Sequence, residues 1–310
     1  MSALLVGCNS QNNHSINTVK LGDAHLCEKY SGLPVNWIRD NKAGMAFIKG
    51  GEFEIGNNSS YPEERSVLKS KRTVNDFWID RTEVTNAQFE SFVKATDYIT
   101  QAELQGDAAV FIPADQSADL SWWKLVKGAN WKQPNGPNDS YVIKPNEPVR
   151  MITLADAIAY ANWLGRDLPT EEQWEYVAKL NQKADLGPTT HGVNSNIWHG
   201  EFPFENKGID GYEGVAPVGC YSPNQAGLFD MIGNVWEYTQ TPFEGSHDDH
   251  MGMSQLKSEA QKVHNIYTIK GGSFLCASNY CQRYTVTARH PQEADLAISH
   301  VGFRTVLNLK

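Results

Sequence analysis

The sequence predicts an α+β fold, a single loop-rich domain with little regular secondary structure. Three segments in the first 180 residues carry helix-capping patterns, whereas the C-terminal part shows only short strand-like runs between glycines and aromatic residues. With 310 residues, of which 40% are hydrophobic, the chain can bury a large core. Its 25 Gly, 14 Pro, 9 Trp and 12 Tyr residues favour a domain stabilised by aromatic packing over a helical bundle.

The N-terminus resembles the end of a bacterial lipoprotein signal. Leu5-Val6-Gly7-Cys8 fits the pattern Leu-x-Gly-Cys, in which the cysteine carries the lipid, and the polar residues after it fit a tether. The apolar run before it is short and uncharged, so a chance match in a cytoplasmic protein is the alternative. We expect a truncated signal and tether over residues 1–40, a lipid anchor at Cys8, and a periplasmic domain over residues 41–310 attached to the cell envelope.

Strands are expected near the start of the domain. Residues 45–48 and 53–56 are apolar-rich runs on either side of Lys49-Gly50-Gly51-Glu52, which predicts a β-hairpin closed by a glycine turn. Residues 74–80 are rich in residues that favour strands and predict one more.

Threonine caps mark the expected helices. The segment 85–88 forms a capping box in front of apolar residues at helical spacing. A second helix is predicted over residues 153–164, and Thr170 caps a third, with Gln173 closing the box. Residues 97–149 have no periodic pattern and are expected to be irregular, with tryptophans that pin them to the core or line a cleft.

The charge balance of the chain is acidic. Its formal net charge is −9, with 27 Lys and Arg against 36 Asp and Glu, and no basic block interrupts the sequence. Nucleic acid and anionic membrane surfaces are therefore not expected to be its main partners.

Two of the five cysteines, Cys276 and Cys281, lie close together after a glycine pair. Neither a strand nor a helix points two side chains five residues apart toward one spot. Residues 277–279 (Ala-Ser-Asn) favour a turn, and a turn would bring the two thiols together. Two thiols that converge across a turn form either a disulfide or a soft-metal site. Cys27 and Cys220 could pair in an oxidising compartment, although their connectivity cannot be deduced from sequence.

Two glycine-rich loops carry side chains that suit a hard cation. Asn196 and Asp210 flank the first loop, and Asp230 and Glu237 bracket the second. Carboxylate, amide and main-chain oxygens are the ligands that calcium prefers. Because Asp-Gly more often marks only a turn, each loop alone is a weak indication of calcium.

The order of the motifs resembles one family. Between residues 44 and 304 the chain contains Phe-Ile-x-Gly-Gly-x-Phe-x-Ile-Gly, Asp-Arg-Thr-Glu-Val-Thr-Asn, Leu-Pro-Thr-Glu-x-x-Trp-Glu-Tyr, Gly-Asn-Val-Trp-Glu, Gly-Gly-Ser and Val-Gly-Phe-Arg. This order is similar to that of the formylglycine-generating enzymes, also called sulfatase-modifying factors. The most specific pattern, Gly-Gly-Ser-x-x-Cys-x-x-x-x-Cys-x-Arg-Tyr-x-x-x-Ala-Arg, spans residues 271–289 without a gap. The resemblance implies the C-type-lectin-like fold of these enzymes for the sulfatase-modifying factor domain over residues 41–310.

The resemblance implies an oxidase that converts a sulfatase cysteine to Cα-formylglycine. In true members of the family, the residues that match Cys276 and Cys281 bind Cu(I), for which soft thiolates are suited, and the substrate cysteine becomes a third sulfur ligand. Dioxygen then reacts at copper, a hydrogen leaves the substrate Cβ, and the resulting thioaldehyde hydrolyses to an aldehyde. Ser273 and Trp236 match residues that line the oxygen pocket. A thiol reductant is the expected source of electrons.

The resemblance also implies two structural calcium ions. The ligands of the first match Asn196, Ile197, Asp210 and Tyr212. Ile197 and Tyr212 are expected to bind the ion through their main-chain carbonyls, not through their side chains. The ligands of the other ion match Asp230, Gly233, Val235 and Glu237.

The peptide cleft of the family receives an unfolded sulfatase segment of the form Cys-x-Pro-x-Arg. Its positions correspond here to Glu103, Trp123, Tyr280, Arg289, Ser299 and His300. An acidic residue at position 103 would suit the arginine of the substrate. His300 stands where the family often has Asn, and Ala277 replaces a larger residue; both departures bear on the sequence of the substrate.

The alternative function is that of a non-catalytic envelope lipoprotein, which would use the same fold as a scaffold or binding module. The lipid-attachment pattern motivates it. It predicts no copper binding and a permanent disulfide between Cys276 and Cys281. Because an inactive relative has no reason to keep both thiols in the specific pattern, the oxidase is the leading hypothesis.

Overall fold

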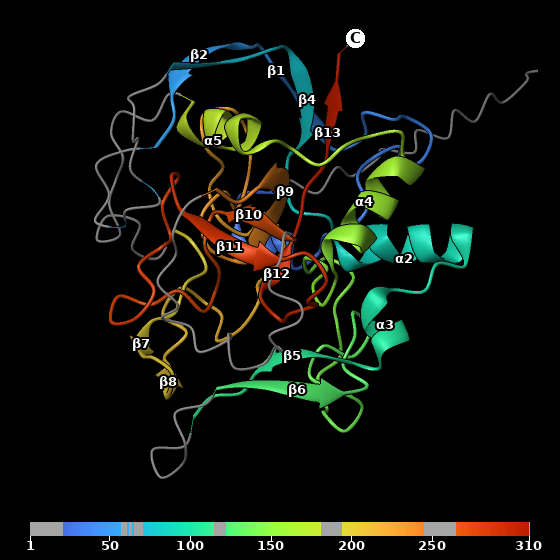
Figure 1. The fold of residues 1–310 in the computed structure, drawn as a ribbon, viewed down its shortest axis with the longest axis vertical. Helices are drawn as coiled ribbons and strands as arrows, with labels where there is room; N and C mark the ends of the chain where they lie inside the picture. The colour runs from blue at the N-terminus through green and yellow to red at the C-terminus, as the bar shows by residue number, and fades with distance from the viewer. Residues whose placement is uncertain are drawn as a thin grey trace, which may run out of the picture.

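The computed structural model describes residues 21–56, 61, 64, 71–114, 122–180, 194–244 and 265–309. Cys8 and the polar run after it, where the lipid anchor and the tether are predicted, lie outside these ranges. Within them, no helix has both the length and the apolar character needed to cross a bilayer. Short helices and small sheets are joined by long loops (Figure 1), which confirms the predicted α+β, loop-rich fold class.

The first described segment, residues 21–40, packs against the domain although it lies in the range predicted as signal and tether. Its helix α1 (Ala24–Cys27) begins after Asp23, whose side chain accepts a hydrogen bond from the main chain of His25. Cys27 is fully buried and forms a disulfide with Cys220. The pairing that was possible from the sequence is therefore present, and it ties the start of the described chain to the loops of the C-terminal part.

Three helices begin at the predicted threonine caps. They are α2 (Asn86–Thr96), α4 (Leu154–Trp163) and α5 (Glu171–Lys179), and each has a complete capping box. Helices α2 and α4 contact each other on one side of the molecule (Figure 1). In the described ranges no α-helix follows α5, as the loss of helical periodicity predicts.

The hairpin predicted over residues 45–56 is wrong in its pairing. Both of its strands form, as β1 (Met45–Ile48) and β2 (Gly51–Glu54). However, β1 pairs with β4 (Phe77–Asp80) and β2 pairs with β3 (Lys71–Val74), in both cases antiparallel. The strand predicted over residues 74–80 is accordingly interrupted between β3 and β4.

The physical reason lies at the glycine pair between β1 and β2. A Cβ on Gly50 would lie 2.2 Å from the carbonyl oxygen of Val74 on the facing segment. The carboxylate of Asp76, on that same segment, accepts hydrogen bonds from the main chain of Gly50 and from Lys49. The glycine therefore permits close approach of the facing backbone and does not close a turn.

The stretch 97–149, predicted to be irregular, contains regular elements. Helix α3 (Gln101–Gln105) begins with a capping box, and β5 (Asp107–Phe111) pairs with β6 (Trp123–Lys127) in an antiparallel arrangement. Each element has only five residues, too few for a clear periodic pattern. Trp123 and Trp131 are buried in the main core, so they pin this stretch to the domain.

The central sheet has the strand order β11-β10-β9-β12. Its strands are β9 (Trp236–Pro242), β10 (Ile266–Lys270), β11 (Arg289–Glu293) and β12 (Val301–Gly302), and only β12 and β9 are parallel. A second sheet, β1-β4-β13, joins the C-terminal strand β13 (Val306–Asn308) to the N-terminal strands. In Figure 1 the central sheet lies between this second sheet and the β5–β6 pair.

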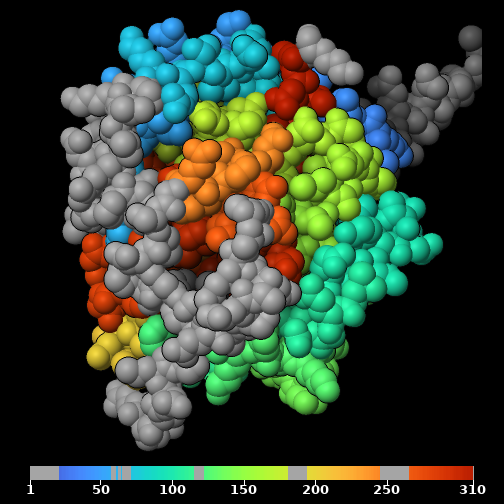
Figure 2. Space-filling view, viewed as in Figure 1, coloured from blue at the N-terminus to red at the C-terminus, as the bar shows by residue number. Residues whose placement is uncertain are grey.

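The main core surrounds the central sheet and includes the loop that follows β10. The strand pair β7 (Gly200–Glu201) and β8 (Glu205–Asn206) lies in the long connection that leads to β9. Figure 2 shows the C-terminal segments, in orange and red, emerging between the N-terminal strands and the helical part of the chain. The core cluster that contains both cysteines of the loop after β10 draws its residues from Val84 to Phe303.

Candidate active site

The loop between β10 and β11, residues 271–288, brings the two predicted thiols together, and we call it the thiol loop. The Sγ atoms of Cys276 and Cys281 lie 3.5 Å apart, and both side chains are buried. The main chain of Tyr280 donates a hydrogen bond to the carbonyl of Ala277, which closes the predicted turn. No disulfide joins the two sulfurs, so both are thiols in this structure.

Gly272 lets this loop lie against the segment that follows the second cysteine. Its φ of 83° is in the left-handed region, and a Cβ there would lie 2.5 Å from the carbonyl oxygen of Arg283. The carbonyl of the neighbouring Gly271 accepts a hydrogen bond from the main chain of Gly233. A side chain at position 272 would push the two halves of the thiol loop apart.

The two thiols differ in pKa. Burial raises the pKa of Cys276 well above its ordinary value, and the thiol donates a hydrogen bond to Cys281. That hydrogen bond and the charge of Arg283 outweigh the effect of burial and lower the pKa of Cys281 to about 7. The pair therefore holds one thiol and one group that is readily ionised near neutral pH.

Two residues from the N-terminal region contact Arg283. Its guanidinium lies 3.8 Å from the centre of the Tyr61 ring, and its Nε lies 3.9 Å from a carboxylate oxygen of Glu64. The hydroxyl of Tyr61 also accepts a hydrogen bond from the main chain of Gln282. These contacts hold the cation beside Cys281.

Of the two predicted oxygen-pocket residues, Ser273 lies beside the thiol pair and Trp236 lies in the core around it. Ser273 is buried in the loop itself, and its main chain donates to Sγ of Cys276 at 3.4 Å. Trp236 begins the neighbouring strand β9 and belongs to the same core cluster as the two cysteines. Its ring centre lies 5.7 Å from that of His290. Ser273 is therefore in contact with the thiol pair, whereas Trp236 shares the surrounding core.

Several predicted cleft residues form an aromatic group near the loop. The ring centres of Trp123 and His300 are 4.8 Å apart, and Ser299 precedes the histidine. Burial lowers the pKa of His300 to about 3, so its imidazole is neutral, and its Nδ1 has no hydrogen-bond partner. Tyr280, from the thiol loop, stacks on Phe202 with 4.4 Å between ring centres.

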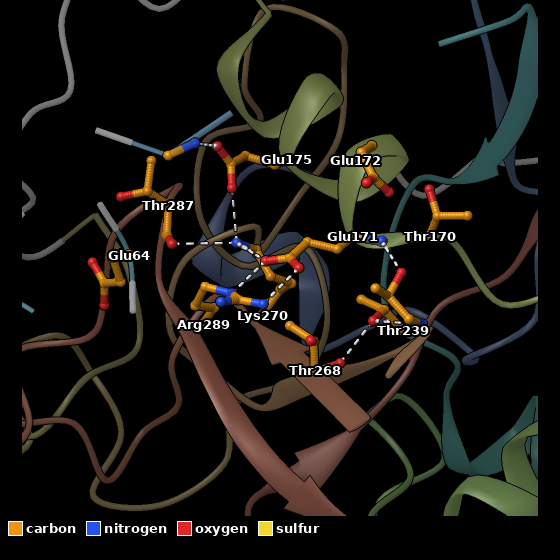
Figure 3. Close-up of polar contacts among 12 residues, drawn as sticks. Glu64, Thr170, Glu171, Glu172, Glu175, Thr239, Thr268, Lys270, Thr287 and Arg289 are labelled. Carbon is orange, nitrogen blue, oxygen red and sulfur yellow. Dashed lines mark hydrogen bonds and ion pairs between the residues drawn. The ribbon is translucent and has the colours of Figure 1, made fainter. Parts of the chain in front are cut away.

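The other two predicted cleft residues, Glu103 and Arg289, are engaged elsewhere. Glu103 closes the capping box of α3 and lies 2.9 Å from the ammonium of Lys132. Arg289 makes two hydrogen bonds, of 2.7 and 3.0 Å, to the carboxylate of Glu171 (Figure 3). Both residues are thus held in ion pairs, and each would have to leave its partner to bind a substrate.

Arg289 belongs to a group of buried and partly buried charges, which we call the α5 ion cluster: Glu171, Glu175, Lys179, Lys270 and Arg289. Lys270 is fully buried, and its ammonium lies 2.9 Å from Glu175 and 3.5 Å from Glu171 (Figure 3). Lys179 pairs with Glu175 at 2.8 Å. Because Lys270 directly precedes the glycine pair, this cluster attaches the start of the thiol loop to α5.

The first predicted calcium loop presents a buried oxygen that finds no donor. Asn196 is buried, and its Oδ1 has no hydrogen-bond partner. The carboxylate of Asp210 accepts hydrogen bonds from the main chains of Ile197 and Tyr212, and burial raises its pKa. Nε2 of His199 lies 3.4 Å from the same carboxylate. A hard cation would satisfy the amide oxygen and stabilise the carboxylate, so these donors fit calcium.

The second predicted calcium loop contains buried carboxylates. Glu237 accepts two hydrogen bonds from Arg304, of 2.6 and 2.7 Å. Asp230 accepts a hydrogen bond from the main chain of Gly219, and burial raises its pKa to about 6. A carboxyl with such a pKa lacks sufficient positive charge around it.

Glu83 joins this loop and was not predicted as a site residue. It is fully buried; its Oε1 accepts a hydrogen bond from Asn234, and its Oε2 has no donor. Burial and the charge of Asp230 raise the pKa of Glu83 well above its ordinary value. We call Glu83, Asp230, Glu237 and Arg304 the acidic cluster, since three carboxylates face one guanidinium. The motif around Glu83 was recognised in the sequence, but nothing in it shows that this side chain meets the second loop.

The two calcium loops are joined by backbone contacts. A Cβ on Gly233 would lie 2.3 Å from the carbonyl oxygen of Asn196, which accepts a hydrogen bond from the main chain of Asn234. Nowhere in the described ranges do three or more His, Cys, Asp or Glu side chains converge as metal ligands. Main-chain oxygens, as predicted for Ile197, Tyr212, Gly233 and Val235, would therefore have to complete either calcium site.

Comparison with known proteins relates this chain to one family. A family model described as "Sulfatase-modifying factor enzyme 1-like domain" matches residues 31–309. The chain is 39% identical to the formylglycine-generating enzyme of Mycobacterium tuberculosis, over 84% of this chain and 96% of that protein. The Mus musculus enzyme of the same name is 37% identical, over 84% and 74% respectively. A Bos taurus relative named inactive C-alpha-formylglycine-generating enzyme 2 is 32% identical, over 84% and 86%.

Solved structures share the fold at lower identity. PvdO from Pseudomonas aeruginosa superposes with a TM-score of 0.60 at 19% identity, covering 86% of this chain and 95% of that one. CarF superposes with a TM-score of 0.53 at 18% identity, covering 86% and 98%. At these identities the likeness establishes the fold alone.

Proposed function

The chain belongs to the sulfatase-modifying factor family, and we propose that it is a formylglycine-generating enzyme, which oxidises a sulfatase cysteine to Cα-formylglycine. The observation that carries this proposal is the pair Cys276 and Cys281, two buried thiols 3.5 Å apart in the family's most specific pattern. The substrate is an unfolded sulfatase segment of the form Cys-x-Pro-x-Arg.

The thiol pair fits a copper(I) ion. Soft thiolate sulfurs select Cu(I) over hard cations, and both sulfurs here are buried away from competing water. Cys276 and Cys281 would hold the ion, and the substrate cysteine would add the third sulfur. Bound copper(I) would supply the reactivity toward dioxygen that thiols alone lack.

The residues around the thiols prepare them for this role. The thiolate is the form of cysteine that binds metals, and Arg283 stabilises the thiolate of Cys281. Cys276 needs more help to ionise because burial raises its pKa, and the main-chain N–H of Ser273 points at its sulfur. We assign Ser273 and Trp236 to the pocket that admits dioxygen.

The overall reaction requires a reductant besides dioxygen. Oxidising the cysteine –CH2–SH to the aldehyde –CHO releases two electrons, and the sulfur leaves as H2S. Reducing dioxygen to two waters takes four electrons, and one of these waters is consumed when oxygen replaces sulfur. Two equivalents of a thiol reductant supply the remaining two electrons by forming a disulfide.

We place the substrate segment against Trp123, Tyr280, Ser299 and His300. The neutral imidazole of His300 has a free Nδ1 with which to bind the peptide. Glu103 and Arg289 are held in ion pairs, and we assign them to keeping α3 and β11 in position beside the cleft.

We also propose two structural calcium ions. The first would be bound by Asn196, Ile197, Asp210 and Tyr212, and the unpaired Asn196 oxygen supports it. The second would be bound by Asp230, Gly233, Val235 and Glu237, and the excess of buried carboxylates in the acidic cluster supports it.

A cell-envelope location with a lipid on Cys8 is part of the proposal, and a cytoplasmic location is the alternative. The disulfide between Cys27 and Cys220 supports an oxidising compartment, because such bonds rarely persist in a reducing cytosol. The mass of the mature N-terminal peptide distinguishes a lipidated Cys8 from an unmodified one.

The decisive experiment incubates copper-loaded protein with a Cys-x-Pro-x-Arg peptide and a thiol in air, and detects the aldehyde by mass spectrometry. We expect product from the wild type and none from Cys276→Ser. Ser278→Ala, an exposed change in the same turn, is the matched control and should keep the activity.

Two outcomes would contradict the oxidase: no aldehyde from the wild type, or undiminished aldehyde from Cys276→Ser. If the native protein also shows no titratable thiols and binds no copper, the non-catalytic scaffold becomes the better explanation.

A further inference from the structure

A cavity of about 310 Å³ lies beside the thiol loop and is not explained by the copper or calcium sites. Phe274, from the thiol loop, and Ser299, a predicted cleft residue, both line it. Its charged and phenolic lining comes from the segment before α4 and consists of Tyr141, Lys144, Glu147 and Arg150. The cavity thus adjoins the proposed peptide cleft without including either cysteine.

Arg150 is a buried cation in the wall of this cavity. It is 7% exposed, its Nη1 lies 3.4 Å from the carbonyl oxygen of Ser299, and its guanidinium lies 5.2 Å from the centre of the Tyr141 ring. Over the described ranges it forms no ion pair with a carboxylate. A guanidinium has five N–H donors, and a buried charge without a counter-ion is costly. The position therefore favours a ligand with a negative charge.

The other charged groups of the lining already have partners. Glu147 accepts hydrogen bonds from the hydroxyl of Tyr141 and from the main chain of Lys144. The ammonium of Lys144 lies 3.6 Å from a carboxylate oxygen of Glu28, outside the cavity. Burial raises the pKa of Tyr141 to about 12, so its hydroxyl stays a donor to Glu147. Arg150 is the group in this lining that is left to bind a ligand.

We propose that Arg150 recognises a carboxylate on the sulfatase segment, an Asp or Glu side chain close in sequence to the target cysteine. The inference rests on the proposed function, because the ligand is taken to be the peptide bound at the thiol loop. Guanidinium and carboxylate form two parallel hydrogen bonds, which makes arginine selective for this group. The acidic side chain enters between Phe274 and Ser299 and meets Arg150 at the wall. Arg150 is thus a specificity-determining residue for the substrate.

The test measures binding without turnover. Fluorescent Cys-x-Pro-x-Arg peptides in which Ser replaces the target Cys are titrated with the protein, and fluorescence anisotropy gives Kd. Each position on either side of the serine is filled in turn with Glu and with Gln, which have the same shape but differ in charge. We expect Glu to bind about tenfold more tightly than Gln at one position, a modest value for one charge-assisted pair.

Arg150 variants assign that preference to the cavity. Arg150→Leu is expected to lose it, and Arg150→Lys to keep only part of it, since a lysine retains the charge but not the paired donors. Lys144→Gln is the matched control. The charge it removes belongs to the same lining but is already paired with Glu28, so this variant should keep the preference.

Thermal unfolding of the same variants separates recognition from a structural role. Without peptide, Arg150→Leu is expected to have an unchanged or higher Tm, because it removes a buried charge that forms no ion pair with a carboxylate in the described ranges. A lower Tm would mean that Arg150 stabilises the fold instead.

The inference is overturned if Glu and Gln peptides bind the wild type equally at every position, or if Arg150→Leu keeps the preference. Failure of every peptide to bind the wild type is a different result. It would reject the proposed substrate, and the carboxylate recognition built on it would fall with it.

Discussion

Two buried groups of charges lie on either side of Trp174, and they differ in charge balance. In the α5 ion cluster, three cations face two carboxylates, whereas in the acidic cluster three carboxylates face one guanidinium. Trp174 touches both, since the Lys270 ammonium lies 5.8 Å from its ring centre and its Nε1 donates to Glu237 at 2.8 Å. The two clusters also meet in the central sheet, where Lys270 on β10 is paired in register with Glu237 on β9.

The difference shows which buried charges serve the fold and which are suited to a ligand. In the α5 ion cluster, burial alone would raise the pKa of Glu175, but the charges of Lys270 and Lys179 outweigh it and lower that pKa. In the acidic cluster, burial prevails, and the pKa values of Glu83 and Asp230 are raised. A carboxylate with a lowered pKa has its counter-ion in the protein, while one with a raised pKa fits a cation from solution.

Of the substitutions that test this difference, Lys270→Met is expected to have the largest effect on the free energy of unfolding. It keeps the bulk of the side chain but leaves Glu175 with one cation fewer, so the free energy of unfolding should fall by about 3–5 kcal/mol. Urea denaturation measures this loss. Lys179→Met is the control, because that side chain is 23% exposed and its pair should contribute only about 1 kcal/mol. Equal losses in the two variants would contradict a special role for the buried lysine.

Calcium should stabilise the protein through the acidic cluster. At one hundred times Kd, a ligand that binds only the folded state adds about 2.7 kcal/mol, which corresponds to a rise of several degrees in Tm. Thermal unfolding in calcium and in chelator measures the shift. We expect Glu83→Gln to reduce it and Glu175→Gln to leave it unchanged. A shift of the same size in both variants would place the ion elsewhere.

The same two substitutions should have unequal effects in the chelated protein. Glu175→Gln removes the partner of a buried ammonium and should cost about 2–3 kcal/mol. Glu83→Gln removes one of three carboxylates that repel one another, so it should change the free energy of unfolding by less than about 1 kcal/mol or increase it. A loss at Glu83 as large as that at Glu175 would show that the acidic cluster is already balanced.

The contributions of the two clusters to the free energy of unfolding should also change with pH in opposite directions. Each proton changes that free energy by at most about 1.4 kcal/mol per pH unit. The pKa of Glu175 is lowered from its ordinary 4.5, so its contribution is present above that pH and is lost as the pH falls further. The pKa of Asp230 is raised from 3.8 to about 6, so its contribution is present below pH 3.8 and is lost as the pH rises through 6. Unfolding of Glu175→Gln and Asp230→Asn against the wild type, in chelator, measures both slopes. Slopes of the same sign would refute the contrast.

Local patterns predicted the helices better than the strands. Thr85, Thr153 and Thr170 cap helices as expected, because a capping box involves residues only three apart. The hairpin around Gly50 was mispredicted, because whether a glycine pair turns or runs straight depends on the facing chain, here at Asp76. Strand pairing is a contact between distant segments, and a short pattern does not contain it.

The candidate site divides in the same way. Convergence of the thiols across the turn at residues 277–279 followed from local sequence, and the structure has it. Nothing local indicated that Arg289 would be bound to Glu171 on α5, since these residues are 118 apart in sequence. Nor did any pattern single out Arg150, because its proposed role depends on the lack of an ion pair with a carboxylate in the described part of the fold.

By itself, the sequence determined the family, the α+β class, three capped helices and the spacing that lets two cysteines meet. All of these depend on residues close together in the chain, where short-range sterics and hydrogen bonds leave few alternatives. Only the tertiary structure decided that Glu83 meets Asp230, that Cys27 pairs with Cys220, and which charges are neutralised. The reason is physical: the stability of a buried charge depends on every group within a few ångströms, and folding brings those groups together from the whole length of the chain.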